Sequence, residues 1–471
     1  MTPPDGGGPA MPGLDRSHRD GAASDRGGAA ARGVSRPRQE LAAADGGAAA
    51  VPQPAPQAFS LPIQVVEADG ISAWLVEDHA VPVVSIAWAW RGGAALDPPG
   101  EEGAASVAAA MLTEGAGTLQ AVEFADALRD EAISLNFAAD RDGFEGSFRA
   151  LADALPAALR LARLAMTQPR LDAEALERVR ARAVAAARRA LETPRGQAGR
   201  AFWAAAYPEH PAGRPSGGTA ESLTDLPVEA IRAALARQAR REGLLVAASG
   251  AITPEALREV LPRLFAGLPE GAPPSPPPLP AFRRFGQQVI PVSAPQSAVV
   301  FGQDGLHADD PDWEAAQVML RILAGGGFAS RLMQAVRERR GLAYGIGGGL
   351  DVMFRHGVIV GSVATENARV AETLAVTREE WARMAEHGPT AEELADAVAY
   401  LTGSLPLQFA DTRRIADGLL SLRQNLRPPE WLAGRPARLM ALGRERIAAV
   451  SARLLRPAEL SVMVAGEPVG L

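Results

Sequence analysis

The order of apolar and polar positions predicts a mixed α+β chain from Phe59 onward. Short apolar runs bounded by Gly, Asp and Pro indicate strands, whereas apolar residues three and four apart indicate helices. The first strands are expected at residues 63–66, 72–76 and 83–90. The helices that follow are expected at residues 105–113, 121–131, 155–166 and 172 to about 191. A sheet packed with helices therefore opens this part of the chain.

A proline cluster at residues 269–280 interrupts this pattern. Proline lacks the backbone N–H that helices and central strands require, so the cluster predicts an extended connector. Beyond it the pattern resumes, with strands near residues 288–292 and 296–302 and helices at 311–323 and 330–340.

The two sides of this connector also repeat each other. Residues 231–250 align without a gap on residues 447–466, with Gly250 matched to Gly466. Each segment has the pattern of a helix followed by a buried strand that ends in glycine. The alternative is a chance similarity between two alanine-rich helices. We favour a tandem repeat of one domain.

The predicted organisation has four parts. They are a disordered tail or degraded targeting segment at 1–58, a first domain at 59–268, a Pro-rich linker at 269–285 and a second domain at 286–471. The tail has Arg and Asp scattered among Gly, Ala and Pro, with no aromatic residue before Phe59, so it cannot bury a core. No secretory signal is visible, which makes the cytoplasm the default compartment. A misassigned start codon would hide such a signal, so the periplasm stays open.

Composition excludes several classes of protein. The net charge is −7 and is spread along the chain, so no nucleic-acid partner is expected. No apolar stretch approaches the ~20 residues of a membrane-spanning helix, so no membrane span is expected. The chain contains no cysteine and no lysine. Thiolate nucleophiles, cysteine zinc clusters, phosphate-loop lysines and Schiff-base lysines are therefore excluded.

The chain resembles the pitrilysin and insulinase-like zinc peptidases, which include the mitochondrial processing peptidases. The segments that carry the resemblance are GAASVAAAMLTEGAGT from Gly103, YPEHPAGRPSGGTAESL from Tyr207 and SRLMQAVRERRGLAYGIGG from Ser330. It extends from about Phe59 to the C-terminus. It implies the processing-peptidase-like metallohydrolase fold, which is α+β with two tandem homologous domains, each a mostly antiparallel sheet packed with helices.

The zinc site of that family is missing from the matching positions. In catalytic members the first segment reads Gly-x-Ala-His-x-x-Glu-His-Met, where two histidines one helical turn apart bind zinc and the glutamate activates water. Here Ser106 and Ala110 stand in place of the histidines, and Ala109 stands in place of the glutamate. The family's third ligand corresponds to residues 184–187, which are valine and alanine only. Because methyl groups offer no lone pair, no metal is expected on this chain.

Other groups do not restore a metal site. The chain has six histidines, none paired at helical ligand spacing, and each is interpreted as a surface or loop residue: His18, His79, His210, His307, His356 and His387. Glu101, Glu102 and Glu114 flank the altered segment and are interpreted as solvated charges at helix ends.

The second half retains Arg337 and Tyr344 at the spacing of the family's arginine and tyrosine pair. The resemblance implies that these residues hold the substrate carbonyl over an active site, as two donors aimed at a developing oxyanion. Ser330 is expected to cap the helix that carries Arg337, and Gly341 is expected to end it. The alternative is that Arg337 belongs to a solvated arginine run and that Tyr344 is a core residue.

The glycine runs at residues 325–327 and 347–349 do not give a dinucleotide fingerprint. They are expected to permit a close backbone turn and an exposed strand edge to which a peptide could add.

The resulting hypothesis is a catalytically incomplete subunit of a heterodimeric zinc metallopeptidase that acts in peptide hydrolysis. A homologous zinc-bearing subunit would supply the metal, and this chain would supply Arg337 and Tyr344 to bind peptide substrates. It would be inactive alone and active only with that partner. One alternative is a non-enzymatic scaffold or binding subunit of a larger complex. Another is an autonomous peptidase with unusual ligands, which would require stoichiometric zinc.

Overall fold

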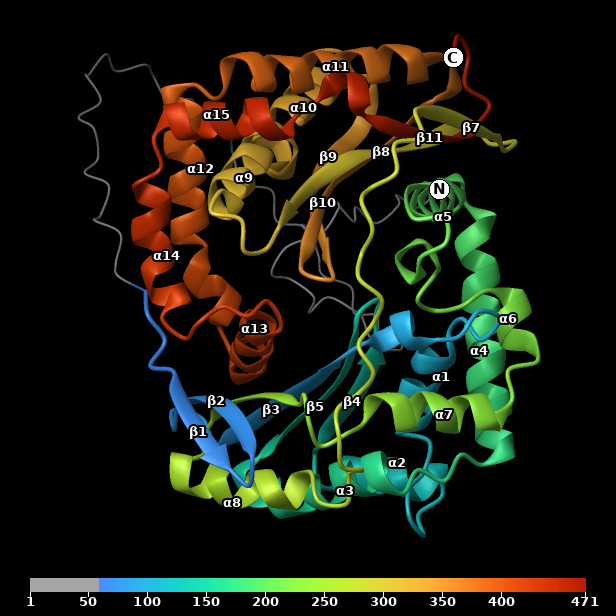
Figure 1. Ribbon diagram of the computed structural model, residues 1–471, viewed down its shortest axis with the longest axis vertical. Coiled ribbons are helices and arrows are strands. Elements are labelled where there is room, and N and C mark those ends of the chain that lie inside the picture. The colour runs from blue at the N-terminus through green and yellow to red at the C-terminus, as the bar shows by residue number, and fades with distance from the viewer. Residues whose placement is uncertain (1–58) are drawn as a thin grey trace, which may run out of the picture.

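Two sheets organise the molecule, one from each half of the chain (Figure 1). The computed structural model describes residues 59–471. The first sheet contains β1 (Gln64–Ala68), β2 (Ile71–Glu77), β3 (Val83–Arg91), β4 (Ser134–Ala139), β5 (Gly143–Leu151) and β6 (Leu245–Gly250). The second sheet contains β7 (Gln287–Pro291), β8 (Gln296–His307), β9 (Ala343–Met353), β10 (His356–Glu366) and β11 (Ser461–Gly466).

Apart from the extra edge strand β1 of the first sheet, the two sheets have the same strand arrangement. The first has the order β1-β2-β6-β3-β5-β4 and the second the order β7-β11-β8-β10-β9. In each, the last strand of the unit pairs parallel with one neighbour and antiparallel with the other. All other pairings are antiparallel. The predicted α+β fold, with tandem homologous units and mostly antiparallel sheets, is confirmed.

Helices surround both sheets. Those in the first half are α1 (Ala104–Met111), α2 (Ala121–Asp130), α3 (Leu155–Thr167), α4 (Ala173–Glu192), α5 (Pro194–Ala206), α6 (Ala220–Thr224), α7 (Val228–Gln238) and α8 (Pro254–Leu264). Those in the second half are α9 (Trp313–Leu320), α10 (Arg331–Met333), α11 (Val370–His387), α12 (Ala391–Gly403), α13 (Thr412–Gln424), α14 (Trp431–Met440) and α15 (Arg444–Leu454). The helices and strands predicted for the first half are confirmed to within a few residues.

Two helices of the second half differ from the prediction in their winding. The helix expected at 311–323 is α9 followed by a π-helical turn, Arg321–Gly325. The helix expected at 330–340 is α10 followed by a second π-helical turn, Gln334–Glu338. Apolar periodicity identifies a helix but cannot separate α from π winding, because both place apolar residues on one face. Such turns often occur at functional sites.

The internal repeat corresponds to equivalent elements. Residues 231–250 contain most of α7 and all of β6, and residues 447–466 contain most of α15 and all of β11. Gly250 and Gly466 both have positive φ, of 119° and 153°. A Cβ on Gly250 would lie 2.0 Å from the Val83 carbonyl oxygen, and one on Gly466 would lie 2.2 Å from the Ser297 hydroxyl. Both positions therefore require glycine.

One face of the first sheet carries the main core of the first half. Trp88, Trp90, Phe144 and Phe148 are fully buried there, under helices that include α3 and α8. The core of the second half lies between its sheet and the helices α9, α11 and α15, with Trp381 fully buried. Each half thus encloses an apolar core of its own.

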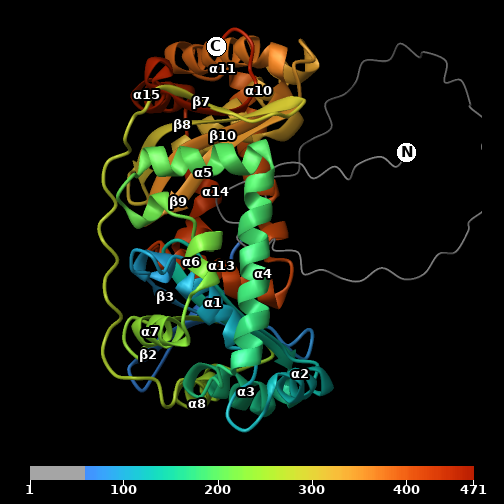
Figure 2. The same cartoon turned by 90° about the vertical axis from the view of Figure 1, so that its right-hand side faces the viewer.

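The opposite face of each sheet is covered by a helix from the other half. Leu419 and Leu420 of α13 pack on Trp74 and Ala87 of the first sheet. In the reverse direction, Phe202 and other residues of α5 pack on Val300 and Met463 of the second sheet. Figure 2 shows α4 running from the level of the first sheet to that of the second, where α5 begins. The two halves are joined by this exchange as well as by the chain.

The proline-rich connector contains no helix or strand between α8 and β7. It runs along the outside of the molecule from the first unit to the second (Figure 2). Its end is anchored, because the rings of Phe282 and Phe285 lie 6.0 and 5.5 Å from that of Phe202. Within residues 59–471, no helix is long and apolar enough to cross a membrane.

Candidate functional site

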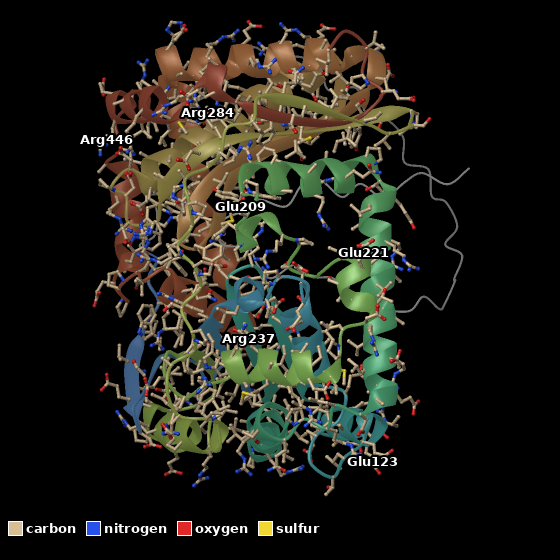
Figure 3. The ribbon with its side chains drawn as sticks, turned by 45° about the vertical axis from the view of Figure 1, so that its right-hand side comes forward. Glu123, Glu209, Glu221, Arg237, Arg284 and Arg446 are labelled. Atoms are coloured by element: carbon tan, nitrogen blue, oxygen red, sulfur yellow. The ribbon has the colours of Figure 1, made fainter. Side chains whose placement is uncertain are left out.

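The helix that carries the altered zinc motif, α1, begins at a buried carboxylate. Asp97 accepts hydrogen bonds from the backbone N–H groups of Gly103, at 3.1 Å, and Ala105, at 3.0 Å. Burial raises the pKa of Asp97 to about 7. The charge of Arg237 of α7, labelled in Figure 3, acts against this rise, and the Arg237 Nη2 lies 4.0 Å from a Glu101 oxygen. The sequence analysis did not identify Asp97.

The three altered positions form no polar site on α1. The Ser106 hydroxyl donates to the Ser216 carbonyl at 2.9 Å and lies 3.5 Å from the Ala139 carbonyl. Ala109 is buried in the core of the first half, and Ala110 is exposed. The serine is therefore engaged with backbone groups, and the two alanines offer methyl groups only.

The helix expected to carry the third ligand does lie beside α1. Val184 and Ala187 of α4 pack against a cluster that contains Val107, Ala108 and Met111 of α1. The helices are also linked by Glu114, whose carboxylate accepts hydrogen bonds from Arg178 and Arg182, both at 2.7 Å. Apolar packing and an ion-pair triad thus hold the two helices together.

The interpretation of Glu114 as a solvated charge is wrong, because both of its oxygens are paired with arginines of α4. Glu102 is also engaged, as its carboxylate accepts from the Gly100 N–H at 3.1 Å and lies 3.6 Å from Arg214. The sequence shows that α4 is rich in arginine. It does not show that two of these arginines pair with Glu114, which lies 64 or more positions earlier in the chain.

His307 and His356 are cross-strand partners on β8 and β10, whereas His79, His210 and His387 lie on separate segments of the chain. His79 and His356 contact single carboxylates, Glu77 at 2.8 Å and Asp304 at 2.7 Å. His210 is buried in a loop, and burial lowers its pKa. His18 lies outside the described residues. In the part of the chain that the structure describes, no three His, Asp or Glu side chains form a group able to hold a metal ion.

The structure brings Arg337 and Tyr344 together at the surface. The Arg337 guanidinium carbon lies 4.5 Å from the centroid of the Tyr344 ring, a cation–π contact. Tyr344 is 79% exposed at the start of β9, so the alternative that it is a core residue is wrong. Ser330 caps α10 as predicted, accepting a hydrogen bond from the Met333 N–H, and Gly341 has a positive φ of 60°.

A third side chain completes this surface group. The Phe328 ring lies 4.6 Å from the Arg337 guanidinium carbon and is 59% exposed. Arg337 therefore contacts two exposed aromatic rings. The sequence analysis did not single out Phe328. The signal available for it was a large apolar residue directly after the glycines at 325–327, in a segment expected to turn. Gly327 does have a positive φ of 58°.

The structure does not bring the altered α1 segment and the arginine–tyrosine pair into contact. Ser106 contacts residues 139 and 216, all within the first half. Arg337 contacts Phe328, Glu338 and Tyr344, all within the second half. Within one chain, the altered α1 segment and the Arg337–Tyr344 pair are therefore separate sites.

Comparison with known proteins places this arrangement in a family. Residues 225–401 match the family description "Peptidase M16 inactive domain". A "Non-peptidase homolog YmxG" from Helicobacter pylori is 27% identical over 357 residues, which are 75% of this chain and 82% of that protein. An "Uncharacterized zinc protease SCO5738" from Streptomyces coelicolor is 30% identical over 210 residues, which are 42% of this chain and 45% of that protein.

A solved structure agrees with these matches. The crystal structure of a peptidase M16 inactive domain from Pseudomonas fluorescens has a TM-score of 0.82 and 25% sequence identity, and the match covers 87% of this chain and 98% of that one. The fold, the family match and the relatives agree with the resemblance carried by the three sequence segments. Along most of its length the chain is similar to the M16 family of pitrilysin and insulinase-like zinc metallopeptidases, its residues 225–401 match the inactive domain of that family, and its segment from Gly103 lacks the His-x-x-Glu-His motif.

Proposed function

We propose that this chain is the substrate-binding subunit of a heterodimeric zinc metallopeptidase. A homologous subunit with an intact His-x-x-Glu-His motif would hold the zinc ion. This chain would place Arg337 and Tyr344 over that site, where the guanidinium and the phenol would bind the carbonyl oxygen of a peptide substrate. Peptide hydrolysis would then require both chains.

The observation that carries the proposal is the exposed contact between Arg337 and Tyr344. An arginine of a solvated run and an unrelated tyrosine need not meet, yet the guanidinium lies 4.5 Å from the ring centroid. Tyr344 is 79% exposed and the Arg337 side chain is 28% exposed, so a molecule outside the chain can reach both donors. They make no contact with the α1 segment of their own chain, which supports a role at the site of another chain.

The glycines of β9 support peptide binding in the same half. β9 is an edge strand of the second sheet, and Gly347, Gly348 and Gly349 follow Tyr344 along it. An edge strand offers unpaired backbone groups to which an extended peptide can add. The strand that presents Tyr344 would thereby also align the peptide.

The test is reconstitution of peptidase activity from the purified chain and its zinc-bearing homologue. We expect the mixture to hydrolyse peptides and each chain alone to be inactive. Arg337→Ala or Tyr344→Phe should lower kcat/KM about 10²–10³-fold, because each removes one donor to the developing oxyanion. Arg340→Ala, which removes a guanidinium from the same arginine run, is the matched control and should change the rate little.

Two results would contradict the proposal. Activity of the mixture that is unchanged by Arg337→Ala and Tyr344→Phe would remove the assigned roles. Recovery of this chain in a large complex without a zinc peptidase would instead favour the non-enzymatic scaffold or binding subunit.

A further inference from the structure

A cleft of about 760 Å³ lies between the two sheets, apart from the Arg337–Tyr344 group. Its volume falls within the roughly 300–1,000 Å³ of typical ligand sites. Side chains of β4 and β5 form one wall, and β9 with the π-helical turn Arg321–Gly325 forms the opposite wall. Residues of α12 and α13 close the cleft between them.

Two arginines of this cleft have guanidinium groups without a carboxylate partner among the described residues. Arg435 is only 4% exposed, and its Nη2 donates to Gln317 at 3.0 Å, while Nε and Nη1 have no hydrogen-bond partner. Arg321 stacks on Tyr400, with the guanidinium carbon 3.3 Å from the ring centroid. Its Nη1 is also buried without a partner.

The other charges of the cleft are already engaged within the protein. Arg413 lies 3.7 Å from Asp417, and Arg414 lies 3.6 Å from Asp411. Glu145 accepts a hydrogen bond from Gln424 at 2.7 Å. Asp140 accepts one from the backbone N–H of Gly143 at 2.7 Å. Among the arginines that line the cleft, those without a carboxylate partner are therefore Arg321 and Arg435, which lie on the same wall.

A buried charged donor that lacks an acceptor destabilises the structure that holds it. Burial lowers the pKa of Arg435 to about 10 and also lowers that of Arg321. Glu314, which acts against this shift at Arg435, is itself paired with Arg438. An anion that entered the cleft would be attracted by both guanidinium groups in a region of low dielectric. The cleft is thus preorganised for a negative group.

The rest of the lining is amphipathic. Leu407 and Tyr400 at the cleft are 68% and 50% exposed, so both offer apolar surface to a molecule that enters it. Asn136, Ser147 and Gln408 add polar groups along the walls. The Ser404 hydroxyl there is buried and has no hydrogen-bond partner.

This combination favours a peptide over a simple aliphatic acid. The apolar residues suit side chains, whereas the amide and hydroxyl groups suit the main-chain amides that an aliphatic acid lacks. The unpaired guanidinium groups suit a carboxylate, and a peptide of any sequence carries one at its C-terminus.

We propose that the cleft binds the C-terminal end of a peptide, with its terminal carboxylate beside Arg321 and Arg435 and its last apolar side chains against Leu407 and Tyr400. The choice of a peptide rests on the proposed function, but the site itself belongs to this chain alone. It would anchor one end of a substrate away from the residues that contact the scissile bond.

The experiment measures fluorescence anisotropy of a fluorescein-labelled apolar heptapeptide with this chain alone. The peptide is used in two forms, with a free C-terminal carboxylate and with a C-terminal amide. We expect the free acid to bind at least tenfold more tightly than the amide. Arg321→Gln should reduce binding of the acid to the level of the amide without changing binding of the amide.

Three further variants separate the effect of charge from those of apolar contact and folding. Leu407→Ser should weaken both forms by a similar factor, because it removes apolar contact and no charge. Arg258→Gln on α8, an exposed arginine paired with Glu255, is the matched control and should change neither form. Arg435→Met tests the buried guanidinium, and circular dichroism and a melting curve establish whether that variant is folded.

Equal affinities for the acid and the amide would overturn the inference, as would an acid affinity that a folded Arg321→Gln variant retains. Binding of octanoate at this site without binding of either peptide would overturn the assignment to a peptide. None of these measurements involves the zinc-bearing partner or turnover. The inference can therefore fail while reconstituted peptidase activity stands, and the reverse also holds.

Discussion

At the scale of single residues, the altered positions of α1 were predictable and their surroundings were not. Ser106, Ala109 and Ala110 follow from spacing relative to Gly103 and Met111. The capping role of Asp97 and the pairing of Glu114 depend on contacts between elements, which the order of residues does not give. The same holds for Phe328, whose ring lies against Arg337 only once the glycine turn brings it there.

Asp97 gives a prediction about pH at this scale. Its pKa is raised to about 7 in the folded chain, above the value of about 4 expected when unfolded. The folded state therefore holds this proton more tightly, so the group's contribution to stability is present below about pH 4 and is lost as the pH rises to about 7. The slope is at most about 1.4 kcal/mol per pH unit.

In the Asp97→Asn variant, the decrease in the free energy of unfolding between about pH 4 and pH 7 that Asp97 causes should disappear, even if the variant is more or less stable overall. Urea unfolding at pH values from 4 to 8 measures it. The control is Asp126→Asn on α2, an exposed residue paired with Arg129, which should retain the slope. A slope that persists unchanged in the Asp97 variant would show that other groups cause it.

At the scale of elements, periodicity located β1, β2, β3 and α1 to α4 to within a few residues, and the internal repeat predicted the equivalence of β6 and β11. Two features of these elements could not be predicted from the apolar pattern. The π-helical turns that carry Arg321 and Arg337 share their apolar pattern with ordinary helices. The helices α5 and α13 have apolar faces that predict burial, but a pattern cannot tell which sheet will bury them.

Leu419 tests the packing of α13 on the first sheet. Leu419→Ala should lower the free energy of unfolding by about 2–5 kcal/mol, because the side chain is fully buried against Trp74 and its neighbours. Chemical denaturation measures this change. Val122→Ala, at a residue of α2 that is 72% exposed, should change stability by less than about 0.5 kcal/mol. A Leu419 variant as stable as the Val122 variant would contradict the assigned packing.

At the scale of the whole molecule, the exchange of α5 and α13 makes the connector dispensable for holding the halves together. A specific protease site inserted after Pro277 should allow cleavage of the connector, and the two fragments should still elute as one species in size-exclusion chromatography. The apolar contacts around Leu419 and Phe202 remain after cleavage. Leu419→Asp, which places a charge in one of these contacts, should promote separation of the cleaved fragments. Separation without that substitution would contradict this view.

The position of α13 near the end of the chain also has a consequence for biosynthesis. The inner face of the first sheet, with Trp74, Val76 and Ala89, stays open until this helix leaves the ribosome. At about 5–20 residues per second, synthesis from Gly250 to Thr412 takes roughly 8 to 32 s. For that interval the nascent first half presents a broad apolar surface to the cell. Chaperone supply during translation should therefore limit the yield of this protein.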